Sequence, residues 1–103
     1  MTGAGESGGP ERIVVEGGAV LRFAPHARFR FDEVRQAWVV LAPERLLMPD
    51  EEAVEILRLI DGVRDIDAII DELVRRYEAP REVIAADVVA MLQDLVDKKV
   101  LRR

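Results

Sequence analysis

The residues that most often carry catalysis are sparse in this chain. It has 103 residues, with one histidine and no cysteine. That histidine, His26, follows Pro25 in a loop-like stretch, and no second histidine or cysteine is present to complete a metal site or a nucleophile pair. Gly17 and Gly18 are not followed by the Lys-Ser/Thr pair of a phosphate-binding loop. We therefore predict no catalytic residue, no metal site and no cofactor.

The acidic side chains are spaced as helix caps and solvated helix faces, and no two of them converge as an acid–base pair would. The net charge of -5 also argues against nucleic acid, whose affinity for proteins comes mostly from Lys and Arg. Between positions 50 and 72, nine acids stand against Arg58 and Arg64. One side of the fold is therefore expected to be strongly acidic. The nine acids are Asp50, Glu51, Glu52, Glu55, Asp61, Asp65, Asp67, Asp71 and Glu72.

The remaining chemistry is backbone hydrogen bonding at the edge of a sheet. Trp38 to Leu41 is a β-branched and aromatic run of strand length, and Ala42 to Arg45 carries a proline-centred turn signal. Leu46 to Met48 is then a strand of only about three residues, because Pro49 lacks a backbone donor. A short apolar edge strand is either a margin protected against aggregation or a place where a peptide adds as a further strand.

Two further segments precede this run. Arg28 to Asp32 alternates polar and aromatic residues, which predicts a half-buried strand that pairs antiparallel with Ala37 to Leu41. The result is a three-stranded meander in a domain that covers residues 25–103. Residues 1–24 are interpreted as a flexible N-terminal extension, in which the Gly17-Gly18 pair between two apolar runs is a hairpin signal.

Three helices are expected after the sheet. Asp50 and Asp65 are placed to cap the first two, Gly62 to end the first, and the third runs from about Arg81 to Lys98. The sequence therefore predicts an α+β fold, in which an antiparallel three-stranded sheet is followed by three helices.

The third helix has an apolar face that spans roughly 160° around its axis, more than a small core usually needs. One explanation is that this helix is central and is touched by the sheet and by both other helices. The other is that its Val89 and Val96 flank helps to wall a groove beside the sheet edge.

In sequence, residues from about 25 to 101 resemble the PqqD family of pyrroloquinoline quinone (PQQ) biosynthesis. The first 24 residues lie outside the resemblance. The features that carry it, in order, are Arg28-Phe29-Arg30, the run from Trp38 to Arg45, the run from Ala53 to Leu57, Asp61-Gly62, Asp87-Val88 and the run from Leu95 to Leu101.

The resemblance implies a winged-helix-like fold and the role of a RiPP recognition element, an adaptor that is not an enzyme. Its partners would be the ribosomally made precursor peptide PqqA and the radical SAM enzyme PqqE. In such domains the peptide adds beside the third strand and packs against the third helix. The peptide-binding residues expected here are Arg45, Leu46, Leu47, Met48, Val89 and Val96.

Two alternatives stay open. A DNA-binding winged helix shares the order of elements, although the third helix carries Glu82, Asp87 and Asp94 and so lacks the basic character of a recognition helix. A protein that only scaffolds an enzyme would bind PqqE without peptide.

An exposed edge strand could also pair two copies of the chain as a homodimer. With no apolar run of membrane length and no signal-peptide pattern, a cytoplasmic location is expected.

Overall fold

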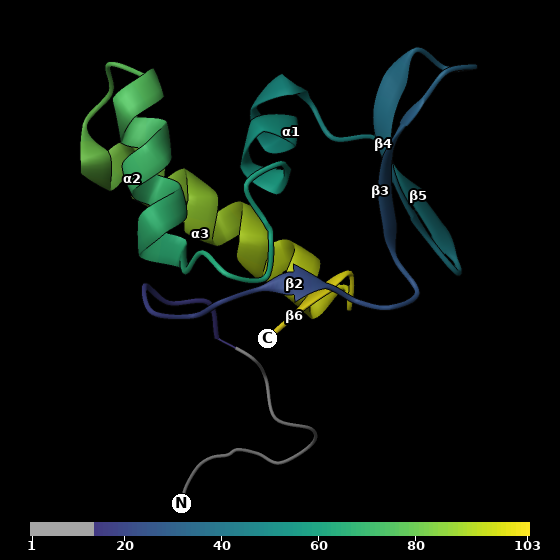
Figure 1. The fold of residues 1–103 in the computed structure, drawn as a ribbon, viewed down its shortest axis with the longest axis horizontal. Coiled ribbons are helices and arrows are strands. Elements are labelled where there is room, and N and C mark those ends of the chain that lie inside the picture. The colour runs from purple at the N-terminus through teal and green to yellow at the C-terminus, as the bar shows by residue number, and fades with distance from the viewer. Residues whose placement is uncertain (1–13) are drawn as a thin grey trace, which may run out of the picture.

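The computed structural model describes residues 14–103, and Figure 1 shows a sheet beside a group of helices. The sheet is antiparallel, with β4 between β3 and β5. The elements are β2 (Arg22–Phe23), β3 (Arg28–Asp32), β4 (Ala37–Ala42), β5 (Arg45–Leu47), α1 (Glu51–Leu57), α2 (Ile66–Arg76), α3 (Arg81–Asp97) and β6 (Leu101–Arg102). The predicted α+β order, a three-stranded sheet followed by three helices, is confirmed, and it is compatible with a winged-helix-like fold. Within the described range no helix is long and apolar enough to cross a membrane.

The sheet is a meander whose last strand lies at an edge. Arg28 to Asp32 pair with Leu41 to Ala37, and Val40, Leu41 and Ala42 pair with Leu47, Leu46 and Arg45. Alternation along β4 turns Val40 toward the helices, where its side chain is buried. Phe29 of β3 stacks on Trp38 of β4 with their ring centroids 4.9 Å apart. These contacts hold β3 and β4 together. Within residues 14–103, no further strand pairs with the outer side of β5.

The caps predicted for the first two helices are present. The side chains of Asp50 and Asp65 each accept a hydrogen bond of 2.8 Å from the backbone three residues on. These bonds satisfy N–H groups that have no partner inside a helix. Gly62 was expected to end the first helix, but this helix already ends at Leu57, and Gly62 follows in a bend with φ of +77°.

The N-terminal segment differs from the expected flexible extension. From residue 14 onward it packs into the core, with Val15, Ala19, Leu21 and Ala24 all buried. The expected hairpin is not formed in residues 14–23, because these residues find other partners. The β2 strand pairs with β6 at the other end of the chain, and carbonyl oxygens in the segment accept hydrogen bonds from the first N–H groups of α2. Residues 1–13 of the expected extension lie outside the described part.

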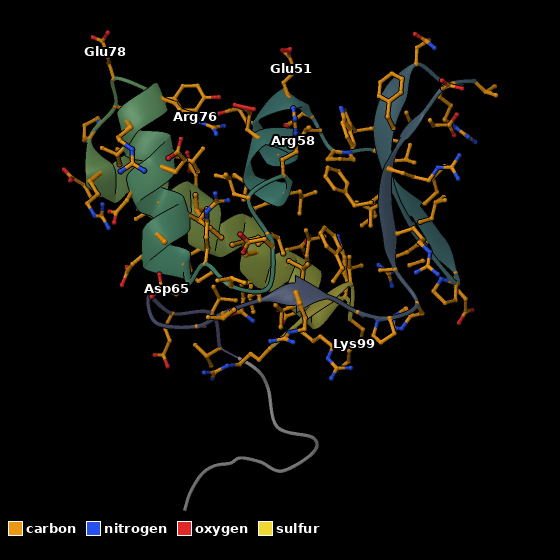
Figure 2. The ribbon with its side chains drawn as sticks, viewed as in Figure 1. Glu51, Arg58, Asp65, Arg76, Glu78 and Lys99 are labelled. Atoms are coloured by element: carbon orange, nitrogen blue, oxygen red, sulfur yellow. The ribbon has the colours of Figure 1, made fainter. Side chains whose placement is uncertain are left out.

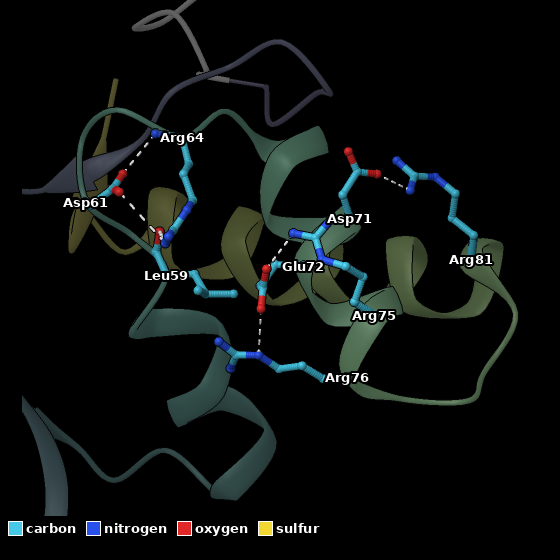
Figure 3. A network of polar contacts seen from close by, with 8 residues as sticks. All are labelled: Leu59, Asp61, Arg64, Asp71, Glu72, Arg75, Arg76 and Arg81. Carbon is cyan, nitrogen blue, oxygen red and sulfur yellow. Dashed lines mark hydrogen bonds and ion pairs between the residues drawn. The ribbon is translucent and has the colours of Figure 1, made fainter.

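Ion pairs on the surface join the helices to one another (Figure 3). Arg76 of α2 donates to Glu72 at 3.0 Å within its own helix and to Glu55 of α1 at 3.3 Å. Hydrogen bonds from Arg75 and Arg76 lower the pKa of Glu72. Each exposed pair contributes little stability by itself, and Arg76 links α1 to α2 at the surface. Figure 3 draws the pair of Arg76 with Glu72, and also the pairs Asp71–Arg81 and Asp61–Arg64.

The end of α3 predicts a stabilising substitution. Lys99 has a φ of +68°, and it and Val100 donate backbone hydrogen bonds to Val96 and Leu95 in the pattern of a Schellman cap. A residue with a Cβ is strained in this conformation and glycine is not. We expect Lys99→Gly to raise the free energy of unfolding by about 1 kcal/mol, measured by urea denaturation.

The matched control is Lys98→Gly, one residue earlier, where φ is -82° and glycine relieves no strain. That variant should be less stable than the parent. Equal effects of the two glycines would contradict the assignment of strain to position 99.

Candidate functional site

The open edge of the sheet is apolar and accessible. Leu46 of β5 has 40% of its surface exposed, and Met48, the residue after the strand, has 57%. Leu47 between them is half-buried, pairs with Val40 and packs against the core. Pro49 then ends the run, so the edge is only a few residues long. The edge strand predicted at positions 46–48 is therefore confirmed, one residue earlier, as Arg45–Leu47.

A groove of about 210 Å³ lies beside this edge. Its floor is made by Val40 of the central strand and Leu57 of α1, both almost fully buried. One wall comes from the edge strand and the residues after it, and the other from the C-terminal half of α3. The lining side chains are Val40, Leu47, Met48, Pro49, Ala53, Leu57, Met91, Asp94, Leu95 and Lys98. An extended chain laid along β5 could place an apolar side chain in this groove.

The structure brings only part of the predicted site together. Leu47 and Met48 line the groove, while Arg45 and Leu46 lie on the strand beside it with exposed side chains. Val96 is 4% exposed and belongs to the core, and Val89, which packs against the core, does not line the groove either. The helix wall of this groove is therefore formed by a flank of α3 other than the one that carries Val89 and Val96.

The side chains that form this wall are Met91 and Leu95, which lie on one stripe of α3 at a spacing of four residues. Val89 and Val96 lie on another flank, together with Gln93. The N–H group of Val15 donates to Gln93 Oε1 at 2.9 Å, so the N-terminal segment runs along that flank. The sequence signal for Met91 and Leu95 was present in the wide apolar face, but choosing between the flanks required knowing what the N-terminal segment covers.

The rim of the groove is polar on its helix side. Lys98 Nζ donates to Asp94 Oδ2 at 2.8 Å, so these two charges neutralise each other above the apolar wall. Arg45 forms no ion pair within residues 14–103 and leaves a cation at the start of the edge. The groove thus has an apolar interior with a positive charge at one end of the strand that borders it.

The lining of the groove is mainly apolar, with Asp94 and Lys98 as its charged side chains. Over residues 14–103, no three side chains of the metal-binding types gather into a site. His26 is exposed in the turn before β3, away from the residues that line the groove. The open edge and the apolar lining can hold a chain by backbone hydrogen bonds and apolar contacts.

Comparison with known proteins shows which family the chain resembles. The family model for coenzyme PQQ synthesis protein D (PqqD) matches residues 37–101, which include the edge strand and all three helices. A PqqA binding protein of Rhodopseudomonas palustris (strain TIE-1) is 61% identical over 89 residues, which are 86% of this chain and 87% of that protein.

Two solved structures share the fold. The solution structure of the PqqD part of Methylobacterium extorquens PqqCD, described as a functional and stand-alone RiPP recognition element, matches with a TM-score of 0.73 and 41% identity over 87% of this chain and 96% of that one. The crystal structure of PqqD from Xanthomonas campestris matches with a TM-score of 0.55 and 30% identity over 78% of this chain and 89% of that one. In sequence and in fold, this chain belongs to the PqqD family.

Proposed function

We propose that this chain is a cytoplasmic adaptor that binds the precursor peptide PqqA as an added strand beside β5 and presents it to the radical SAM enzyme PqqE. The observation that carries the proposal is the open edge of β5 beside an apolar groove. The family membership and the names of the relatives supply the identity of the peptide. In this role the chain performs no reaction of its own.

The hairpin geometry indicates which backbone groups are available to the peptide. Pro43 and Glu44 form the two-residue turn between β4 and β5, so Ala42 and Arg45 close the hairpin. Antiparallel pairs alternate between those that exchange hydrogen bonds and those that do not. Because the closing pair exchanges them, the N–H and C=O groups of Leu46 turn away from β4 and toward the open edge.

The same alternation directs the groups of Met48 outward and those of Leu47 toward β4. Two residues thus offer up to four backbone hydrogen bonds, each worth a net of about 0.5–1.5 kcal/mol. An apolar side chain buried in the groove adds about 1.5–3 kcal/mol. After the cost of ordering a flexible peptide, a dissociation constant near the micromolar range is consistent with these terms.

Isothermal titration calorimetry with synthetic PqqA tests the peptide-binding part. We expect saturable binding with one peptide per chain and a Kd of about 10 µM or lower. A peptide of the same composition in scrambled order is the control and should bind far more weakly. Equal binding of the two peptides, or none, would contradict the proposal. Binding of duplex DNA in place of peptide would restore the winged-helix alternative.

Presentation to the enzyme needs a separate measurement. Sedimentation velocity of the chain with PqqA and PqqE should show one complex that contains all three components. A complex of chain and PqqE that excludes the peptide would support the scaffold alternative. Sedimentation of the chain alone at several concentrations also tests for the homodimer, which an edge occupied by peptide should disfavour.

A further inference from the structure

A second surface lies on the other side of α1 from the peptide groove. It consists of two adjoining hollows of about 260 and 680 Å³, which share Glu52, Glu55 and Tyr77 in their linings. The smaller hollow lies between α1 and the start of α3, and the larger between α1 and the sheet. We name this surface the acidic face. Pro49 borders both the larger hollow and the peptide groove, so the two surfaces are neighbours.

Several apolar side chains that line the two hollows of the acidic face have much of their surface exposed. Tyr77 and Val83 are 45% and 50% exposed at the smaller hollow, whose floor includes the core residue Leu73. At the larger hollow, Phe31 is 42% exposed although its alternating pattern predicts a core residue. It meets Trp38 edge-on with ring centroids 5.8 Å apart. Exposed aromatic side chains gathered around hollows are typical of protein interfaces.

The rim of the acidic face carries negative charge that the fold does not neutralise. Within residues 14–103, Glu51, Glu52 and Asp87 form no ion pair or side-chain hydrogen bond. Figure 2 shows Glu51 projecting outward from the end of α1. These acids have no role in the backbone pairing or apolar contacts that define the peptide groove.

The basic side chains nearest this surface are already engaged. Arg76 is bound to Glu55 and Glu72, and the guanidinium of Arg58 lies 5.6 Å from the centre of the Trp38 ring. The hydroxyl of Tyr77 donates to Glu55 at 3.2 Å, and desolvation followed by this hydrogen bond raises the pKa of Tyr77. Among the described residues 14–103, Arg58 and Arg76 are therefore not free to complete the rim.

We propose that the acidic face is a second docking surface, which takes a partner protein that presents an arginine or lysine beside apolar side chains. The methylene stem of such a residue would lie against Leu73 and Val83, and its charged head would meet Glu52 and Asp87. Arginine surrounded by apolar contacts is a frequent interface anchor. This inference rests on the proposed function, because the partner we commit to is the enzyme that receives the peptide.

The position of the acidic face suits that partner. A protein docked against α1 and the sheet would lie next to Pro49, where the peptide-binding edge ends. It could thus take the peptide while the peptide remains on β5. An arrangement in which the enzyme covered the groove itself would force it to compete with the peptide.

The test measures two affinities for each variant, with PqqE and with PqqA as separate probes. Glu52→Lys and Asp87→Lys should each weaken PqqE binding by about tenfold, and leave the Kd for PqqA within about twofold. Glu16→Lys makes the same charge change on an exposed residue of the N-terminal segment and should alter neither affinity by more than about twofold. Val83→Ser should weaken PqqE binding without a change of charge, with Val34→Ser, in the β3–β4 turn, as its control.

The remaining outcomes refute either the docking surface or the peptide site. Unchanged PqqE binding in the Glu52→Lys and Asp87→Lys variants would overturn the proposal, as would an equal loss for Glu16→Lys or an equal loss of PqqA binding. If the parent chain binds PqqA but not PqqE, the docking surface is refuted and the peptide site stands. If PqqA does not bind while PqqE binding falls in both charge-reversal variants, the peptide site is refuted and the docking surface stands.

Discussion

Replacing Leu46 with proline is expected to weaken PqqA binding by about tenfold or more, while the domain remains folded. The N–H group of Leu46 points to the open edge, so proline removes a donor that the peptide uses and β4 does not. The proline ring also occupies the place where the added strand must approach. Calorimetry with PqqA measures the affinity, and urea denaturation confirms the fold.

Two variants separate this effect from others at the same edge. Leu46→Ala keeps the backbone donor and should lose only a few-fold in affinity. Leu47→Pro should instead destabilise the domain, because Leu47 pairs with Val40 in the sheet. Normal PqqA affinity in a folded Leu46→Pro variant would rule out strand addition at β5.

Truncating Met91 to alanine is expected to weaken PqqA binding by about fivefold to thirtyfold, because Met91 forms the helix wall of the groove. Methionine adapts its shape to different partners, which suits a wall that must close on a peptide side chain. The side chain is half-buried, so the variant should also lose some stability. Affinity is therefore measured well below the unfolding temperature of each variant.

The matched variant is Val89→Ala on the other flank of α3, which also packs against the core but does not line the groove. It should lose stability while it keeps the affinity for PqqA. The reverse result, with Val89→Ala weakened and Met91→Ala unaffected, would place the peptide on the flank that the sequence alone suggested. The two variants together thus test which flank of α3 contacts the peptide, and this test does not depend on the edge strand.

Much of the fold could be predicted from local signals. The alternation of Arg28 to Asp32, the turn at Pro43 and the caps Asp50 and Asp65 each depend on neighbours within a few residues, and the structure contains all of them. The short strand stopped by Pro49 was predictable for the same reason. Local hydrogen bonding and fixed backbone angles decide such features, so a single sequence is sufficient.

The errors came from contacts between distant parts of the chain. Arg22 and Phe23 pair with the last strand, and Val15 reaches Gln93 on α3, contacts that span most of the sequence. No local sequence pattern predicts these long-range contacts. Once the N-terminal segment covers the flank of Val96, only the other flank is left to face the sheet edge. The difference between the predicted helix residues, Val89 and Val96, and the residues that line the groove thus follows from the placement of the N-terminal segment.

Amide hydrogen exchange at β5, followed by NMR with and without PqqA, tests the central claim most directly. The claim predicts that the Leu46 amide exchanges at least about tenfold more slowly with peptide bound, because it gains a hydrogen bond, while Leu47, already paired with β4, changes little. Slower exchange along β3, the other open edge of the sheet, with no change at Leu46 would contradict it.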